Sequence, residues 1–182
     1  MGMYTGLRFK GIIKNEYRED VKKAITDIEG AWGNCEHEEL KKFDKVDRSF
    51  CIPFGGLSYM PDCWEESENE NATNGFGRYF NETTGLLCFQ CSLKNYEDTI
   101  EYFIEKVIPV ICEKLIHCEV LYEEWEVSEL YEFKEGIVTQ LDYGIRYSQE
   151  ENLFSYGGIQ SDKKDKNILY ENFDFTTESK YR

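Results

Sequence analysis

Leu86-Leu-Cys-Phe-Gln-Cys-Ser-Leu93 is an apolar run typical of a strand, and a helical pattern follows it in Asn95-Tyr-Glu-Asp-Thr-Ile-Glu-Tyr-Phe-Ile-Glu-Lys-Val-Ile-Pro-Val-Ile-Cys-Glu-Lys-Leu115. The turn Asn81-Glu-Thr-Thr-Gly85 joins the run to Gly77-Arg-Tyr-Phe80 as a predicted hairpin. We expect Asn95 to cap the helix and Pro109 to kink it. Its apolar stripe is Tyr96, Ile100, Phe103, Ile104, Val107, Ile108, Ile111, Cys112 and Leu115. A hairpin followed by an amphipathic helix indicates a fold with both α and β elements.

Similar patterns occur before this stretch. Alternating basic and apolar side chains in residues 5–14 predict a strand. Apolar residues on one helical face then predict a helix from Asn15 to about Ile28, with Gly30 suited to its end. Residues 31–47 give no firm element, and residues 49–54 are expected to form a short strand that Pro53 stops.

The pattern after residue 116 is less decisive. Residues 119–133 are compatible with a strand or a helix. The turn Lys134-Glu-Gly136 and the apolar run that follows it favour a hairpin, and therefore strands. One more strand is expected at residues 145–147.

The predicted order is β-α-β-β-β-α-β-β-β, an α+β fold. Its simplest packing is a mostly antiparallel sheet with two amphipathic helices on one face. An elaborated split-βαβ (ferredoxin-like) plan fits this order. We expect a single domain over residues 1–160, followed in residues 161–182 by a polar linker and a C-terminal tail or extra strand.

Negative charge is concentrated in the middle of the chain. Residues 61–150 contain 20 Asp+Glu and 6 Lys+Arg, a net charge of −14 within a total of −15. Aromatic side chains alternate with the carboxylates in residues 119–135, and interfaces favour such aromatic anchors. Complementary charge also speeds association with a basic partner. The predicted partner-binding residues are Glu65, Glu66, Glu68 and Glu70 in the loop 61–77, with Glu123, Glu124, Trp125, Glu126, Glu129 and Glu132. A solvated acidic face is the alternative interpretation.

No motif assigns a catalytic residue, a metal or a cofactor. Cys88 and Cys91 have C-x-x-C spacing, but in a strand they would face opposite sides, so core cysteines are favoured over a zinc site. The histidines, His37 and His117, are expected at the surface or at helix caps. The acidic loop has Ala72 where a calcium loop needs an oxygen ligand.

Composition also bears on partners and compartment. Seven cysteines without a signal peptide favour the cytoplasm, and no apolar run approaches the ~20 residues of a membrane span. Direct binding to nucleic acid is disfavoured, because nearby acids offset the one basic cluster. This basic cluster consists of Arg8, Lys10, Lys14, Arg18, Lys22 and Lys23.

In size, acidity and lack of catalytic motifs the chain resembles small phage-borne inhibitors, which include anti-CRISPR proteins and other DNA-mimicking anti-defence proteins. The resemblance implies an inhibitor that occupies the basic nucleic-acid-binding surface of a CRISPR effector or another nuclease. An immunity protein for a nuclease toxin would use the same electrostatics. A small enzyme or ligand-binding domain, with a pocket lined by Trp64, Tyr79 and Trp125, is the third possibility. Whether the loop 61–77 and residues 119–135 form one surface depends on the fold.

Overall fold

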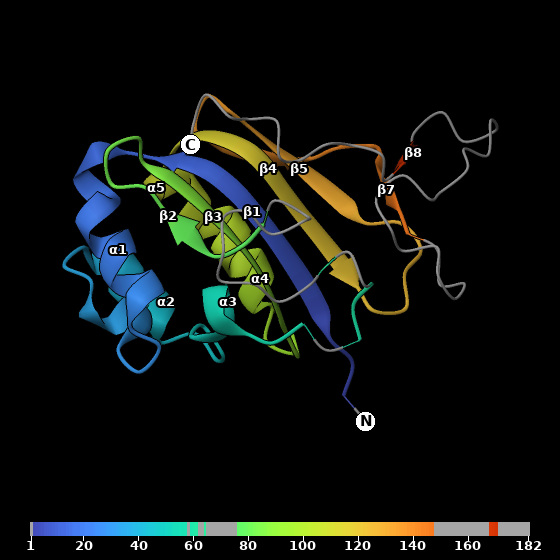
Figure 1. Cartoon of the computed structure of the whole chain (residues 1–182), viewed down its shortest axis with the longest axis horizontal. Coiled ribbons are helices and arrows are strands. Elements are labelled where there is room, and N and C mark those ends of the chain that lie inside the picture. Colours follow the sequence, from blue (N-terminus) through green and yellow to red (C-terminus); the bar gives the residue numbers. More distant parts are fainter. Residues whose placement is uncertain (1, 58, 62–63, 65–75, 148–167, 171–182) are drawn as a thin grey trace.

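A six-stranded antiparallel sheet forms the centre of the fold (Figure 1). The computed structural model describes residues 2–57, 59–61, 64, 76–147 and 168–170. The sheet order is β2-β3-β1-β4-β5-β6. Its strands are β1 (Thr5–Ile13), β2 (Tyr79–Phe80), β3 (Leu86–Leu93), β4 (Cys112–Tyr122), β5 (Glu129–Lys134) and β6 (Ile137–Gln140).

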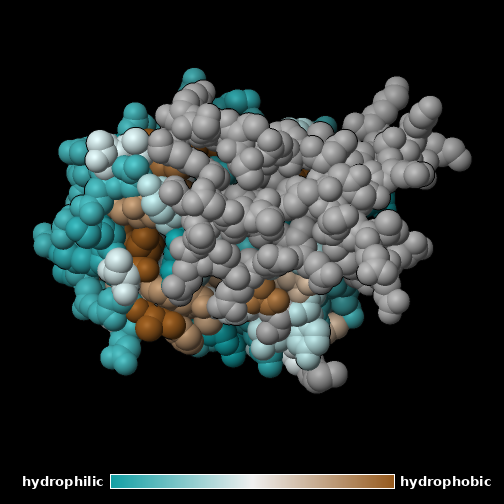
Figure 2. Space-filling model, viewed as in Figure 1, coloured by the Kyte–Doolittle hydropathy of each residue, from teal (hydrophilic) through white to brown (hydrophobic). Residues whose placement is uncertain are grey.

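The helices pack on one side of this sheet. A 3₁₀ turn (Asn15–Tyr17) leads into α1 (Arg18–Thr26), and a second (Ala31–Asn34) precedes α2 (Glu38–Asp44) and α3 (Cys51–Phe54). The later helix consists of α4 (Thr99–Tyr102), a π-helical turn (Phe103–Val107) and α5 (Ile108–Ile111). Figure 1 shows α4 and α5 behind the strands, and Figure 2 shows hydrophilic residues over the α1–α2 side of the molecule. No helix in the part of the chain described here is long and apolar enough to cross a membrane.

The connections confirm the predicted α+β fold and follow a split-βαβ plan. The segment with α1 leads from β1 to β2, with β3 between these strands in the sheet. The helix α4–α5 leads from β3 to β4, with β1 between them. Two interleaved βαβ units produce this order. The hairpin β5–β6 extends the sheet beyond β4.

The two faces of the central strands bury different kinds of side chain. Leu7 and Phe9 of β1 face the helices, where Phe9 lies 5.3 Å from Phe89 and 5.9 Å from Phe103 between ring centroids. Arg8 and Lys10 alternate with them and face the opposite side. This second face is also covered, by a smaller cluster of aromatic and aliphatic side chains. The cluster contains Trp64, Phe76, Cys88, Leu121, Leu130, Ile145 and Tyr147.

The predicted helix end at Leu115 was wrong. The helix ends at Ile111, and Cys112 already pairs with Ile13 of β1. In the sequence, apolar residues of β4 continue the helical stripe, so the spacing of apolar residues alone did not reveal where the helix gives way to the strand. A π-helical turn ends at Val107, two residues before Pro109, whose ring nitrogen has no N–H for the regular helical bond.

Two predicted strands also differ from the structure. Residues 49–54 contain α3 rather than a strand. Residues 119–133 do not form one continuous element, because β4 ends at Tyr122 and β5 begins at Glu129. Strands are nevertheless the correct choice over a helix for both ends of that segment.

Other predictions near the C-terminal end were confirmed. The turn between β5 and β6 has positive φ at Glu135 (52°) and Gly136 (80°), as tight hairpin turns require. β7 (Gly144–Arg146) lies within one residue of the strand expected at 145–147, and β8 (Ile168–Tyr170) pairs with it in parallel. Residues 168–170 are the part of segment 161–182 that the structure describes, and they form β8.

Candidate interaction site at one end of the sheet

Three chain segments meet at one end of the sheet because of the strand register. Thr5, the first residue of β1, pairs with Leu93 at the end of β3 and with Tyr122 at the end of β4. The residues that precede β1 and those that follow β3 and β4 therefore emerge together. The backbones of Tyr4 and Glu123 continue the pairing, since Glu123 N donates to Tyr4 O at 3.0 Å.

Aromatic side chains gather at this end. Tyr4 and Tyr59 have ring centroids 5.7 Å apart, and so do Tyr122 and Trp125. Three of the aromatic residues expose much of their surface: Tyr59 (69%), Tyr96 (59%) and Trp125 (41%). We name this region the aromatic–acidic end, made of Tyr4, Tyr59, Tyr96, Tyr122, Glu123, Glu124 and Trp125. Tyrosine and tryptophan are enriched at interaction surfaces.

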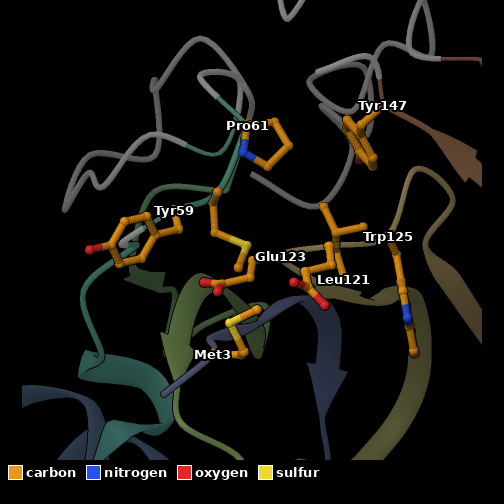
Figure 3. Close-up of a pocket in the computed structure, with 9 residues that line it drawn as sticks. Met3, Tyr59, Pro61, Leu121, Glu123, Trp125 and Tyr147 are labelled. Carbon is orange, nitrogen blue, oxygen red and sulfur yellow. The ribbon is translucent and has the colours of Figure 1, made fainter. Parts of the chain in front are cut away.

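A hollow of about 400 Å³ opens in the aromatic–acidic end (Figure 3). Figure 3 shows Tyr59 on one side of it and Trp125 on the other, with Glu123 between them. The lining residues are Met3, Tyr59, Met60, Pro61, Leu121, Glu123, Glu124, Trp125 and Tyr147. The hollow therefore combines an apolar wall with two carboxylates.

The two carboxylates of the hollow differ in how they are held. Glu123 Oε2 accepts a hydrogen bond from Tyr4 N at 3.0 Å, which fixes the side chain against the start of β1. Glu124 is exposed, and the structure gives it no hydrogen bond or ion pair within the described residues. Partial burial and the charges of Glu124 and Glu123 raise the pKa of Tyr122. The two carboxylates therefore place negative charge beside Tyr122.

Three of the predicted partner-binding residues come together here, and three do not. Glu123, Glu124 and Trp125 line the hollow. Glu126 instead pairs with Arg146 at 2.7 Å, and Glu132 pairs with Lys134 at 2.7 Å. Glu129 accepts a hydrogen bond from the Tyr131 hydroxyl at 2.9 Å. The remaining predicted residues, Glu65, Glu66, Glu68 and Glu70, lie outside the described residues.

The start of the acidic loop lies beside residues 121–125. Met60 and Pro61 line the same hollow as Leu121 and Trp125. Trp64 packs against Tyr147 with ring centroids 5.9 Å apart, and Tyr147 is itself a wall of the hollow. The described start of the loop 61–77 therefore lies next to residues 121–125 at the aromatic–acidic end.

A buried ion cluster lies behind the hollow on the second face of the sheet. The guanidinium of Arg8 is fully buried and lies 4.2 Å from the Trp64 ring centroid. Its Nη1 donates to the Tyr147 hydroxyl at 3.1 Å and lies 3.7 Å from Glu119 Oε2, while its Nε donates to Gln90 Oε1 at 3.2 Å. The Tyr147 hydroxyl donates to Glu119 Oε1 at 2.7 Å. Tyr147 thus connects the hollow to the ion cluster.

The protonation states of this cluster follow from its contacts. Burial alone would raise the pKa of Glu119, but the hydrogen bond from His117 and the charge of Arg8 outweigh it and lower the pKa. Burial lowers the pKa of His117, whose Nε2 lies 3.0 Å from Glu119 Oε2. Arg8 and Glu119 therefore form a charged pair beside a neutral histidine at neutral pH.

This ion cluster was not predicted from the sequence. His117 was expected at the surface or at a helix cap, and Arg8 and Lys10 were counted in the basic cluster. His117 instead lies within β4 with its side chain only 12% exposed, and Arg8 and Lys10 are buried. The register of β1 and β4 points to the cluster, because it places Arg8 directly opposite Glu119. That register could be derived only once the boundary of β4 was known.

The rest of the basic cluster forms no unpaired basic patch. Lys14 donates to the carbonyls of Pro109 and Val110, and Arg18 to those of residues 13 and 82–84. Lys22 and Lys23 form ion pairs at 2.9 and 3.0 Å. Every cation of the cluster is thus engaged within the protein.

The cysteines and histidines do not assemble a metal site in the described part of the chain. Cys91 lies in the core under the helices, while Cys88 lies in the cluster on the opposite face. This is the opposite orientation that strand alternation predicted. Burial raises the pKa of Cys35 to about 12 and the pKa values of Cys91 and Cys118 well above the usual range, which favours the protonated thiol over the nucleophilic thiolate.

Of the three aromatic residues suggested for a ligand pocket, only Trp125 lines the hollow. Trp64 is buried beside Arg8, and Tyr79 lies on the edge strand β2.

Comparisons with protein-family models, with curated proteins and with solved structures gave no match for this chain. A function must therefore be inferred from its own side chains.

Proposed function

We propose that the protein is an acidic inhibitor that binds a basic nucleic-acid-binding protein through the aromatic–acidic end. The observation that carries the proposal is the meeting of Glu123, Glu124 and Trp125 around one hollow among exposed tyrosines. Aromatic residues supply contact area, and carboxylates attract the Arg and Lys side chains that otherwise hold phosphates. The inhibitor would then compete with nucleic acid for the same surface, as the resemblance to anti-defence proteins implies.

The charge distribution supports a protein partner over nucleic acid. The net charge of −15 repels phosphate, and ion pairs and hydrogen bonds to other groups of the protein engage the basic cluster. A negative surface accelerates encounter with a positive one, and the effect weakens as salt rises. Binding should therefore be steeply salt-dependent.

Two charge variants near opposite ends of β4 test the proposal. Glu124→Lys places a positive charge at the hollow, while Glu113→Lys makes the same change of net charge at the opposite end of β4. Roughly ten residues at ~3.3 Å each separate these sites, so they lie about 30 Å apart. Both glutamates are exposed, so neither change should disturb the core.

The three immobilised proteins are exposed to lysate of the source organism, and captured proteins are identified by mass spectrometry. We expect the wild type and Glu113→Lys to retain a basic nucleic-acid-binding protein that Glu124→Lys loses. Duplex DNA or RNA should displace this protein from the wild type. Equal capture by all three proteins, or capture indifferent to salt and nucleic acid, would refute the proposal.

A further inference from the structure

The hollow in the aromatic–acidic end has the size and lining of a pocket for one long cationic side chain. Its volume of about 400 Å³ is near the lower limit for small-molecule sites, which suits a side chain better than a helix or a strand. Met3, Met60 and Leu121 supply apolar contacts for an aliphatic stem. Glu123 and Glu124 supply negative charge for the group at its tip.

The same protein already binds a guanidinium in this manner. Arg8 lies 4.2 Å from the ring centroid of Trp64 and 5.9 Å from that of Tyr147, and it pairs with the carboxylate of Glu119. The hollow shares Tyr147 with this internal site and repeats its chemistry, with Trp125 as the indole and Glu124 as the carboxylate. An indole and a carboxylate around one space are the partners that a planar guanidinium prefers.

We infer that the hollow binds a single arginine side chain of the partner, with its guanidinium at Glu124 and the Trp125 ring and its stem against the apolar wall. This inference rests on the proposed function, because it names the group that the aromatic–acidic end would recognise. Arginine is favoured over lysine because its planar group stacks on aromatic rings and bonds a carboxylate with two N–H groups. The arginines that hold nucleic acid in a basic partner are suitable donors.

The pocket is tested with short probes rather than with a partner. Three decapeptides of Gly and Ser carry one central residue, which is Arg, Lys or the neutral Arg analogue citrulline. The indole N–H signals of the protein are followed by NMR during titration, and a Trp125→Phe variant assigns the signal of Trp125. Trp32 is fully buried and serves as an internal reference.

We expect the Arg peptide to move the Trp125 signal in a saturable manner and the citrulline peptide to bind at least about tenfold more weakly, which corresponds to about 1.4 kcal/mol. Glu124→Gln should lower the affinity of the protein for the Arg peptide, while Glu113→Gln should leave this affinity unchanged. An unmoved Trp125 signal, or equal binding of the Arg and citrulline peptides, would overturn the pocket. Equal binding of the Lys and Arg peptides would overturn the choice of arginine.

The outcome separates this inference from the proposed function. If the peptides fail but Glu124→Lys still abolishes binding of a basic protein, the docking surface stands and the pocket is wrong. If the Arg peptide binds but no protein distinguishes Glu124→Lys from Glu113→Lys, the pocket stands and the proposed function is wrong.

Discussion

Arg8 and Glu119 are the residues on which the second face of the sheet depends. Both are fully buried, and their charges lie 3.7 Å apart under Trp64 and Tyr147. Removing one member of a buried pair leaves the other charge desolvated without compensation, which is far more costly than losing the pair as a whole. The pair therefore constrains what can replace either residue.

Arg8→Met should lower the free energy of unfolding by about 3–5 kcal/mol, because Glu119 then remains buried without its cation. The matched control is Glu126→Gln, which breaks the more exposed pair with Arg146 and should cost less than about 1 kcal/mol. Urea denaturation of both variants measures the difference. Similar costs for the two variants would show that the buried pair is unimportant for stability.

Asp20 links α1 to the start of α2 and should make stability depend on pH. Its carboxylate accepts hydrogen bonds from the N–H groups of Glu36 (2.8 Å) and His37 (2.9 Å). Burial alone would raise the pKa of Asp20, but these backbone bonds and the His37 side chain outweigh it and lower the pKa. A folded-state pKa below the unfolded value stabilises the protein above the unfolded pKa, and this contribution is lost as pH falls through the folded pKa.

Asp20→Asn should therefore be less stable than the wild type at neutral pH, and the difference should shrink as pH falls below about 4. Denaturation of both proteins between pH 7 and pH 2 gives this difference directly. A difference that is constant over the whole range would mean that ionisation of Asp20 contributes nothing.

At the scale of elements, the sequence predicted the two hairpins but not where each element ends. The hairpins β2–β3 and β5–β6 were predictable because their turns carry Gly85 and Gly136 at positions with positive φ. The boundary between α5 and β4 was not predictable, because the buried residues of both elements are apolar. The side chains that cover the second face come from loops far away in the sequence, so local periodicity could not show that Arg8 is buried.

Gly6 allows the loop segment to approach β1 on the second face. A Cβ at this position would lie 2.6 Å from Trp64 and 2.8 Å from the sulfur of Met60. Gly6→Val should therefore displace these side chains and destabilise the protein by about 1–3 kcal/mol, as overpacking does. Urea denaturation measures the cost, and a red shift of the Trp64 emission reports its exposure. An unchanged spectrum and stability would show that the segment adapts without cost.

At the scale of the molecule, the fold converts a charge pattern into a localised surface. The sequence placed ten residues in one predicted binding set. Of the six that the structure describes, Glu123, Glu124 and Trp125 meet at the hollow. Local ion pairs and hydrogen bonds occupy Glu126, Glu129 and Glu132 on and near the β5–β6 hairpin. The turn after Tyr122, which the sequence did not define, decides which carboxylates face the hollow and which face their own neighbours.

The central claim is that the aromatic–acidic end binds a basic partner, and a comparison of dissociation constants tests it most directly. The affinities of Glu124→Lys and Glu113→Lys for the purified partner are measured across a range of salt concentrations. We predict that Glu124→Lys binds at least about tenfold more weakly at low salt and that the gap narrows as salt screens the charges. Equal dissociation constants for the two variants at every salt concentration would contradict the claim.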